Sequence, residues 1–225
     1  MNKAAIKWSS WLAIIVLVCA AIFLLLFRKN ILERFEAAAS DNPNAAIGYI
    51  GCSNTRETVE GYHRLGGQNM WSYDKRYDAG AVVDWAKGAK TGNKYWRVFD
   101  DLLAEHPHTN TIWWQLCIRH NETDTSYEHA ASILEAVRKR IPNATIYVST
   151  LADYTDGVCE ITGTWGLQKA KELARQLDSA NDDVFPGPVL GPMSPLETAP
   201  DGCHLSSPDG KRKLGQQMRD FFDSQ

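Results

Sequence analysis

The sequence predicts an α/β fold, a three-layer α/β/α sandwich in which helices cover both faces of a mainly parallel sheet. Two observations support this prediction. Beyond residue 44, short apolar runs alternate with segments of helical periodicity, and this alternation is typical of parallel sheets covered on both faces. The chain also has 225 residues, of which 44% are hydrophobic, so it is long enough to bury one core of catalytic-domain size.

The strands are expected in the apolar runs and the helices in the segments between them. Apolar runs predict strands at Ala46–Ile50, Thr111–Ile118, Ala144–Thr150 and Val189–Leu190. The spacing of apolar residues predicts helices at Tyr95–Glu105, Tyr127–Arg140, Gly166–Asp178 and Lys211–Phe222. Two helix starts are also indicated, by the capping-box spacing of Thr125 and Glu128 and by an N-cap followed by proline at Ser207-Pro208.

Residues 8–27 form an uncharged apolar segment near the N-terminus. As a helix rising about 1.5 Å per residue, this segment covers roughly 30 Å, the hydrocarbon thickness of a bilayer. A cleaved signal peptide is the alternative, but the run is long for one, and Arg28-Lys29 stand where a small-residue cleavage site is expected. We therefore predict four regions: a short N-terminal tail at 1–7, an uncleaved transmembrane anchor at 8–27, a stalk at 28–44 and a catalytic domain at 45–225.

Charge and cysteine content bear on partners and compartment. The 196 residues after Lys29 carry 20 basic and 27 acidic side chains, which argues against nucleic acid as a partner because phosphate binding needs a basic face. Basic residues flank the apolar segment on both sides, so the positive-inside rule does not decide the orientation; we predict an extracytoplasmic domain. Cys117 lies in an apolar run and is expected to be a buried, unreactive thiol, whereas Cys159 and Cys203 are a candidate disulfide. The oligomeric state is left open.

A serine lies just beyond the first predicted strand. Ala46–Ile50 is followed by Gly51-Cys52-Ser53, a turn of small residues of the kind by which α/β folds present a nucleophile at a strand's carboxyl end. Most such serines cap a helix or satisfy a turn. A catalytic role for Ser53 therefore depends on whether the chain supplies partners for it.

Candidate partners come from two later loops. Asp201 and His204 lie three residues apart before the last predicted helix, so the carboxylate can receive the Nδ1 proton and orient the imidazole toward Ser53. A metal ligand or a simple turn is the alternative interpretation of this pair. Asn121 follows the strand predicted at Thr111–Ile118, and its amide can donate to an oxyanion unless it stabilises its own turn.

The order of these residues resembles that of the SGNH hydrolase superfamily, the GDSL-type esterases and lipases, whose blocks run Ser, Gly, Asn and Asp-x-x-His. Gly51-Cys52-Ser53-Asn54-Thr55 resembles the first block, with Cys52 in place of the usual aspartate. Asp201-Gly202-Cys203-His204 resembles the last block, including its position before the final helix. The resemblance covers residues 45–224.

The two middle blocks resemble the family pattern less closely. Arg119-His120-Asn121-Glu122 corresponds to Gly-x-Asn-Asp, with Arg119 in place of glycine and Glu122 in place of aspartate. The glycine block is assigned to Gly80, with Gly66 or Gly67 as the alternative. The Cys-Ser-Asn run and Trp114-Gln115 are also similar, more faintly, to the sialate O-acetylesterase branch.

The resemblance implies a flavodoxin-like sheet and a serine esterase. Ser53 is then the nucleophile, His204 the base and Asp201 the residue that orients it, while the Ser53 and Gly80 amides and the Asn121 side chain form the oxyanion hole. No metal or organic cofactor is implied, and the substrate is a small-molecule or glycan ester with a short acyl or O-acetyl group. Two other classes remain open: a catalytically degenerate, membrane-anchored binding or scaffold protein, and an O-acyltransferase that uses the same triad.

The tryptophans offer a further hypothesis about the substrate. Large aromatic side chains chiefly fill cores. Trp71 and Trp165 nevertheless lie in glycine-rich segments, and they are the better candidates for stacking on a sugar ring.

Overall fold

The computed structural model describes residue 23 and residues 42–72, 80–157, 159–205 and 207–224. The chain divides into two units, Met1–Ala39 and Ser40–Gln225, and every element described below belongs to the second. The predicted transmembrane anchor at residues 8–27 lies outside the described residues, apart from Phe23. Within the part of the chain that the structure describes, no helix combines the length and the apolar composition needed to cross a bilayer.

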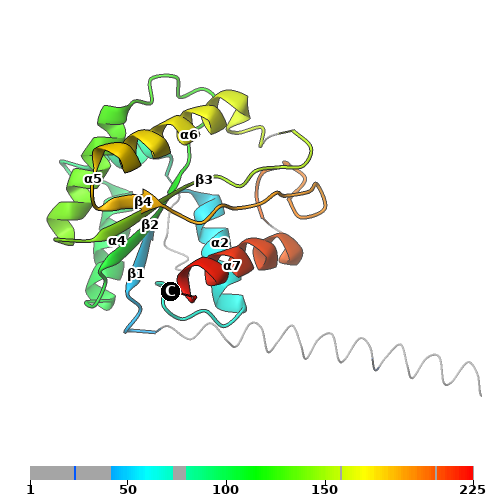
Figure 1. Cartoon of the computed structure of the whole chain (residues 1–225), viewed down its shortest axis with the longest axis horizontal. Helices are drawn as coiled ribbons and strands as arrows, with labels where there is room; N and C mark the ends of the chain where they lie inside the picture. Colours follow the sequence, from blue (N-terminus) through cyan, green and yellow to red (C-terminus); the bar gives the residue numbers. More distant parts are fainter. Residues whose placement is uncertain (1–22, 24–41, 73–79, 158, 206, 225) are drawn as a thin grey trace, which may run out of the picture. The chain divides into compact units, whose positions relative to one another are not determined.

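Four parallel strands form the sheet, in the order β1-β2-β3-β4 (Figure 1). Their bounds are Ile47–Ile50 for β1, Thr111–Leu116 for β2, Thr145–Thr150 for β3 and Val184–Pro186 for β4. An isolated parallel bridge joins Ile47 to Met70 at the free edge of β1. The predicted α/β class with a parallel sheet is confirmed. The strand predicted at Val189–Leu190 is wrong: Val189 is exposed to solvent, and the fourth strand, β4, lies at Val184–Pro186.

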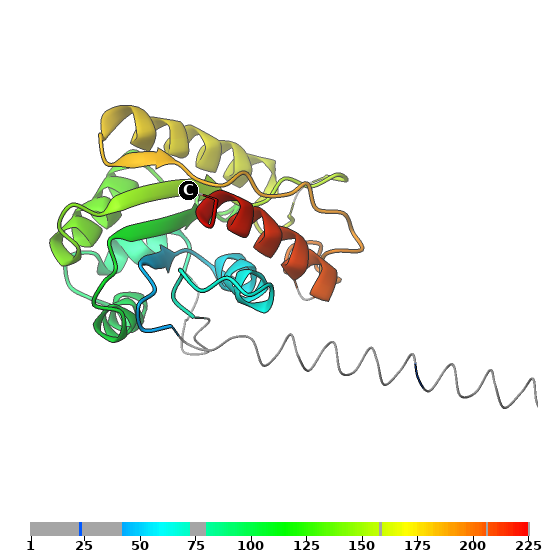
Figure 2. The ribbon, with the colours of Figure 1, turned by 60° about the horizontal axis from the view of Figure 1, so that its bottom comes forward.

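Helices flank both faces of the sheet. They are α2 (Ser53–Arg64), α3 (Val82–Gly88), α4 (Lys94–Glu105), α5 (Tyr127–Arg140), α6 (Gly163–Ala180) and α7 (Pro208–Phe222). Figure 2 shows α2 and α7 side by side on one face, whereas α3, α5 and α6 pack in succession on the other. The connection from β1 through α2 to Met70 crosses the sheet in the opposite direction from those leading to β3 and β4, and right-handed crossovers therefore place α2 on the opposite face.

Two glycines allow α2 and α7 to approach closely. A Cβ atom at Gly61 of α2 would collide with the backbone of Lys211, and one at Gly215 of α7 would collide with the backbone of Gly61. Side chains at either position would push the helices apart. The crossing fixes α2, the helix that begins with Ser53, against the last helix of the chain.

The helix predictions hold for the amphipathic segments and fail for α2 and α3. Helix α2 buries polar residues, Thr55, Glu57 and Thr58 among them, beside Val59 and Tyr62, so its buried face is not a continuous apolar stripe. The N-cap prediction at Ser207 is confirmed, since its hydroxyl accepts a hydrogen bond from the Gly210 amide at 3.0 Å. The capping box predicted at Thr125 is wrong, because α5 begins one residue later, with Ser126 at the N-cap.

Aromatic residues dominate the core around β1 and β2. The side chains that are essentially fully buried include Trp71, Trp85, Trp96, Trp113 and Trp114. The sugar-stacking hypothesis is therefore wrong for Trp71, whose ring lies among core residues and donates to Thr109 Oγ1 at 2.8 Å. Trp165 on α6 keeps 36% of its surface exposed.

Candidate active site

The turn after β1 places Ser53 at the N-terminus of α2. Gly51 has a φ of +156°, and a side chain there would collide with Thr55, so the turn requires glycine. The Cys52 amide donates to Thr55 Oγ1 at 2.9 Å, and that hydroxyl donates to Gln115 Oε1 at 2.7 Å. Because Gln115 is buried in β2, these bonds tie the serine turn to the neighbouring strand.

His204 lies within hydrogen-bond distance of both Ser53 and Asp201. The distance from Ser53 Oγ to His204 Nε2 is 2.7 Å, and the distance from His204 Nδ1 to Asp201 Oδ2 is 2.5 Å. An ionised carboxylate only accepts hydrogen bonds, so Nδ1 carries the imidazole proton and Nε2 accepts from the serine hydroxyl. The structure thus brings three predicted residues into one hydrogen-bonded chain, in which the imidazole is placed to take the hydroxyl proton.

Neighbouring donors hold Asp201 as a carboxylate. Burial alone would raise the pKa of Asp201, but hydrogen bonds from the His204 ring and from the His204 and Cys203 amides lower its pKa to about 2. The two amides donate to Oδ1 at 3.0 and 2.9 Å, while Oδ2 accepts from the ring. The carboxylate is therefore ionised throughout the neutral pH range.

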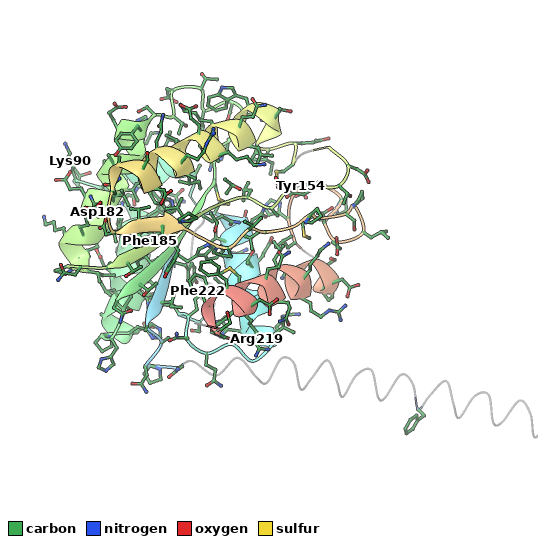
Figure 3. The ribbon with its side chains drawn as sticks, viewed as in Figure 1. Lys90, Tyr154, Asp182, Phe185, Arg219 and Phe222 are labelled. Carbon is green, nitrogen blue, oxygen red and sulfur yellow. A yellow bond between two sulfur atoms is a disulfide. The ribbon has the colours of Figure 1, made fainter. Side chains whose placement is uncertain are left out.

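The backbone around His204 is bonded to side chains from two other elements. The Cys203 carbonyl accepts hydrogen bonds from Asn54 Nδ2 at 3.2 Å and from the Tyr154 hydroxyl at 3.1 Å. The Leu205 amide donates to Glu57 Oε2 at 2.7 Å. Tyr154 lies beside the connection that leads to α7 (Figure 3). Burial, together with the charges of Asp201 and Glu57, raises the pKa of Tyr154 to about 12, so its hydroxyl remains a donor.

Each of the two site loops also carries a disulfide beside its reactive residue. Cys52 is bonded to Cys117, and Cys203 is bonded to Cys159. The second pair is the predicted candidate. The first corrects the prediction of a free thiol at Cys117: the residue is buried as expected, but β1 and β2 are adjacent, and both cysteines follow the carboxyl ends of these strands. Two disulfides indicate a domain outside the reducing cytosol.

A cavity of about 130 Å³ opens beside Ser53 and His204. Much of its wall is apolar, formed by Ala81, Ile118, Leu151 and Ile161. Both disulfides border it as well, through Cys52, Cys117 and Cys203. The cavity therefore combines a candidate nucleophile with a small, largely apolar space.

Arg119 lines the cavity from the loop after β2. Its Nη1 donates to Glu122 Oε1 at 2.6 Å and its Nη2 to Asp84 Oδ2 at 2.8 Å, while 41% of its side chain stays exposed. Burial lowers the pKa of Arg119, but the charges of Asp84 and Glu122 outweigh this effect and raise it. Two carboxylates around one guanidinium leave the cluster with a net negative charge, so this wall offers little attraction to an anionic substrate.

The structure does not bring the other predicted oxyanion donors to the cavity. The Gly80 amide donates to the Gly51 carbonyl at 3.2 Å and thus helps to hold the serine turn. The Asn121 side chain is exposed and is not among the residues that line the cavity. The alternative glycines, Gly66 and Gly67, follow the C-terminus of α2, at the opposite end of the helix from the serine. Among the predicted donors only Ser53 borders the cavity. Ser53 is the first residue of α2, so its amide has no acceptor within the helix.

Sequence reasoning missed three side chains of the site, Asn54, Glu57 and Tyr154. Asn54 and Glu57 belong to α2. The four-residue spacing of Ser53 and Glu57 places those two side chains on one face of the helix. The sequence patterns do not predict α2, so they do not indicate this shared face. Within the described ranges, no group of His, Cys, Asp or Glu side chains is arranged to hold a metal ion.

Comparisons with known proteins add little to this description. No protein-family model and no curated protein sequence matches the chain. Among solved structures, a Clostridium thermocellum family 3 carbohydrate esterase is similar: the match covers 79% of this chain and 94% of that one, with 12% sequence identity and a TM-score of 0.46. A likeness this weak supports no functional inference. The fold and site instead define the chain as an α/β protein with a hydrogen-bonded Ser-His-Asp chain at the carboxyl ends of its parallel strands.

Proposed function

We propose that the domain is a serine esterase of the SGNH type, which hydrolyses carboxylic esters with short acyl groups, O-acetyl esters among them. The observation that carries this proposal is the hydrogen-bonded chain from Ser53 Oγ through the His204 ring to Asp201. The order of the Ser, Asn and Asp-x-x-His blocks in the sequence supports it as well.

The proposed reaction passes through an acyl-enzyme. Ser53 Oγ forms a bond to the ester carbonyl carbon while its proton passes to His204 Nε2, and Asp201 stabilises the resulting imidazolium. The C–O bond to the alcohol then breaks, and the alcohol leaves with the proton from His204. Water, deprotonated by the same imidazole, attacks the acyl-enzyme, releases the carboxylic acid and restores the serine. These steps use only side chains of the protein and water.

The Ser53 amide is the first candidate donor to the oxyanion of the tetrahedral intermediate. It lies at the positive end of the α2 dipole, where developing negative charge is stabilised. The predicted contributions of Gly80 and Asn121 remain predictions. In the present arrangement the Gly80 amide is engaged with Gly51, and Asn121 is exposed.

The size of the cavity supports a short acyl group. Its volume of about 130 Å³ is well below the roughly 300–1,000 Å³ of pockets that hold drug-sized ligands. Its apolar wall suits the methyl end of an acetyl or similar group. The alcohol portion, whether a small molecule or a glycan, then lies toward solvent.

Labelling with a fluorophosphonate probe tests the proposed function. The wild-type protein is expected to take up one label, and the peptide that carries it is expected to contain Ser53. The Ser53→Ala variant is expected to take up none. Labelling that persists in this variant would falsify the assignment of the nucleophile. Hydrolysis of p-nitrophenyl esters of increasing acyl length, measured alongside, is expected to peak at acetate or propionate.

A catalytically degenerate binding protein is the second candidate, and one observation favours it. Two of the three predicted oxyanion donors are not directed at the cavity, and Arg119 occupies the place of the family's glycine. This candidate predicts a folded domain that neither hydrolyses short esters nor reacts with the fluorophosphonate. The labelling experiment therefore separates the two.

We further propose a flavodoxin-like, three-layer arrangement for residues 45–225 and a single-pass membrane anchor at residues 8–27, joined by a stalk at 28–44. The uncharged apolar run in the sequence supports the anchor, and the two disulfides support an extracytoplasmic domain. Alkaline extraction of membranes tests the anchor: the full chain is expected in the pellet, and release into the supernatant would contradict it.

A further inference from the structure

The two peptide groups on either side of His204 are both hydrogen-bonded to the helix that carries Ser53. The Cys203 carbonyl belongs to the peptide group before His204, and it accepts from Asn54 Nδ2 at 3.2 Å. The Leu205 amide belongs to the peptide group after it, and it donates to Glu57 Oε2 at 2.7 Å. The backbone of the histidine is thus held at two points by α2.

Both α2 side chains are buried, which makes these bonds costly to lose. Asn54 is 4% exposed and Glu57 9% exposed. Removal of the Glu57 carboxylate would leave the Leu205 amide without its acceptor in a region that water reaches poorly. The Cys203 carbonyl is less dependent on Asn54, because the Tyr154 hydroxyl also donates to it. Among the described residues, Glu57 is the one acceptor of the Leu205 amide, so Glu57 carries the larger share.

Helical geometry relates Glu57 directly to Ser53. Residues four apart on a helix lie one above the other on the same face. Ser53 presents its hydroxyl to the His204 ring, and one turn further along Glu57 binds the backbone that follows the ring. One helix therefore carries the nucleophile and holds the backbone of its base at two points, beside the Ala199 amide, which donates to the His204 carbonyl at 2.7 Å.

We propose that Glu57 is a positioning residue for the esterase reaction: it sets the distance between Ser53 Oγ and His204 Nε2 through its bond to the Leu205 amide, with Asn54 as a weaker second support. This inference rests on the proposed function. Glu57 does not touch the reacting atoms, so its loss affects the rate of proton transfer rather than substrate binding. A displacement of about 1 Å in a reacting group costs on the order of 100-fold in rate.

Glu60 provides a matched control on the same helix. It is the next carboxylate of α2, and it too is paired with the C-terminal segment, through Lys211 Nζ at 2.7 Å. Its partner belongs to α7 rather than to the His204 loop. A substitution at Glu60 thus removes a carboxylate and an interhelical contact without touching the support of the histidine.

The first measurement is steady-state hydrolysis of p-nitrophenyl acetate by the full chain in detergent. Glu57→Leu is expected to lower kcat about 100-fold with KM changed less than threefold, whereas Glu60→Leu is expected to lower kcat less than threefold. Glu57→Gln keeps an acceptor for the Leu205 amide and is expected to restore most of the rate. Equal kcat values for Glu57→Leu and Glu60→Leu, or a defect confined to KM, would overturn the proposal.

The second measurement separates positioning from a general loss of structure. If Glu57 acts through the histidine, removing Glu57 has no further effect on the reaction rate of Ser53 once His204 has been replaced by alanine. The rate of fluorophosphonate labelling of Ser53 in His204→Ala is therefore expected to change less than twofold when Glu57→Leu is added. A further drop of tenfold or more would show that Glu57 acts on the whole domain, and the proposal would be wrong.

The third measurement does not depend on activity. In protein labelled with ¹⁵N-histidine, the proton on His204 Nδ1 is expected to give a downfield, exchange-protected NMR signal because of its bond to Asp201. This signal is expected to weaken or move in Glu57→Leu and to persist in Glu60→Leu. An unchanged NMR signal in both variants would overturn the proposal for Glu57, whether or not the protein is an esterase. A wild-type protein that takes up no fluorophosphonate would refute only the proposed esterase function.

Discussion

The two sides of the cavity are built in different ways. On the side of Ser53 and His204, the backbone beside each reactive residue is held by hydrogen bonds and by a disulfide to a distant part of the chain. On the opposite side the Arg119 guanidinium lines the cavity and is ion-paired with Asp84 and Glu122. The Ser53 and His204 loops are thus fixed by bonds from several elements, whereas the opposite wall depends on one charged cluster.

The largest expected effect comes from the first side, at Asp201. Asp201→Asn is expected to lower kcat about 10⁴-fold, because a neutral amide no longer fixes the tautomer in which Nε2 accepts the serine proton. The measurement is hydrolysis of p-nitrophenyl acetate, with Asp209→Asn, an exposed aspartate at the start of α7, as the control. A loss below tenfold in Asp201→Asn would contradict a triad.

The pH dependence of stability follows from the same carboxylate. The pKa of Asp201 is about 2 in the folded chain, below the unfolded value of about 3.9. Its contribution to stability is therefore complete above pH 4 and is lost as the pH falls toward 2. Urea unfolding of the wild-type protein and of Asp201→Asn is expected to differ at pH 6 and to converge near pH 2. A difference that stays constant over this range would contradict the lowered pKa.

The disulfides give the next effect, this time on stability. The pairs Cys52–Cys117 and Cys159–Cys203 span 65 and 44 positions of the chain. In the chain-entropy model, closing loops of these lengths stabilises the fold by about 4 kcal/mol each. Replacing both cysteines of either pair by serine is expected to lower the free energy of unfolding by about this amount, as measured with urea. A loss below 1 kcal/mol would show that the bond contributes little beyond the noncovalent contacts of its loop.

The second side of the cavity is tested at Arg119. Arg119→Gly is expected to enlarge the cavity and to raise kcat/KM for butyrate relative to acetate about tenfold, in line with the effect of one or two methylene groups in an apolar pocket. Arg175→Gly, on the exposed surface of α6, has no such effect if the change is local. An unchanged acyl-length profile in Arg119→Gly would show that the ion-paired cluster does not limit the acyl group.

The smallest effect is expected at Asn121. Because its side chain is exposed and outside the cavity lining, Asn121→Ala is expected to lower kcat less than fivefold. Loss of a functioning oxyanion donor typically costs 100-fold to 1,000-fold. A loss of that size would show that the loop after β2 brings Asn121 to the oxyanion when substrate is bound, and it would make the two sides of the cavity more alike.

Sequence reasoning was strongest where a local pattern reports the structure. The amphipathic helices α5 and α7 were predicted closely because each buries a regular apolar stripe. Asp201 and His204 were found because they are neighbours in sequence and contact each other directly. In the same way, the apolar runs predicted the three longer strands.

The failures share a different cause, since they depend on contacts between distant residues. Helix α2 was missed because its buried face includes polar residues such as Thr55 and Glu57, whose partners come from other segments. The pairing of Cys52 with Cys117 follows from the strand order, which no single-segment pattern contains. The surroundings of Gly80 likewise depend on a bond to Gly51 across the sheet edge.

The two bonds that hold His204 to α2 also bear on how the protein can change over evolutionary time. The connection from β4 to Asp201 leaves Leu196 89% exposed, and three residues later the Ala199 amide donates to the His204 carbonyl at 2.7 Å. The tip around Leu196 precedes the Ala199 contact, so a change in its length leaves the bonds from α2 to the His204 backbone in place. The tip can therefore vary in length over evolutionary time while the distance from Ser53 to His204 is kept.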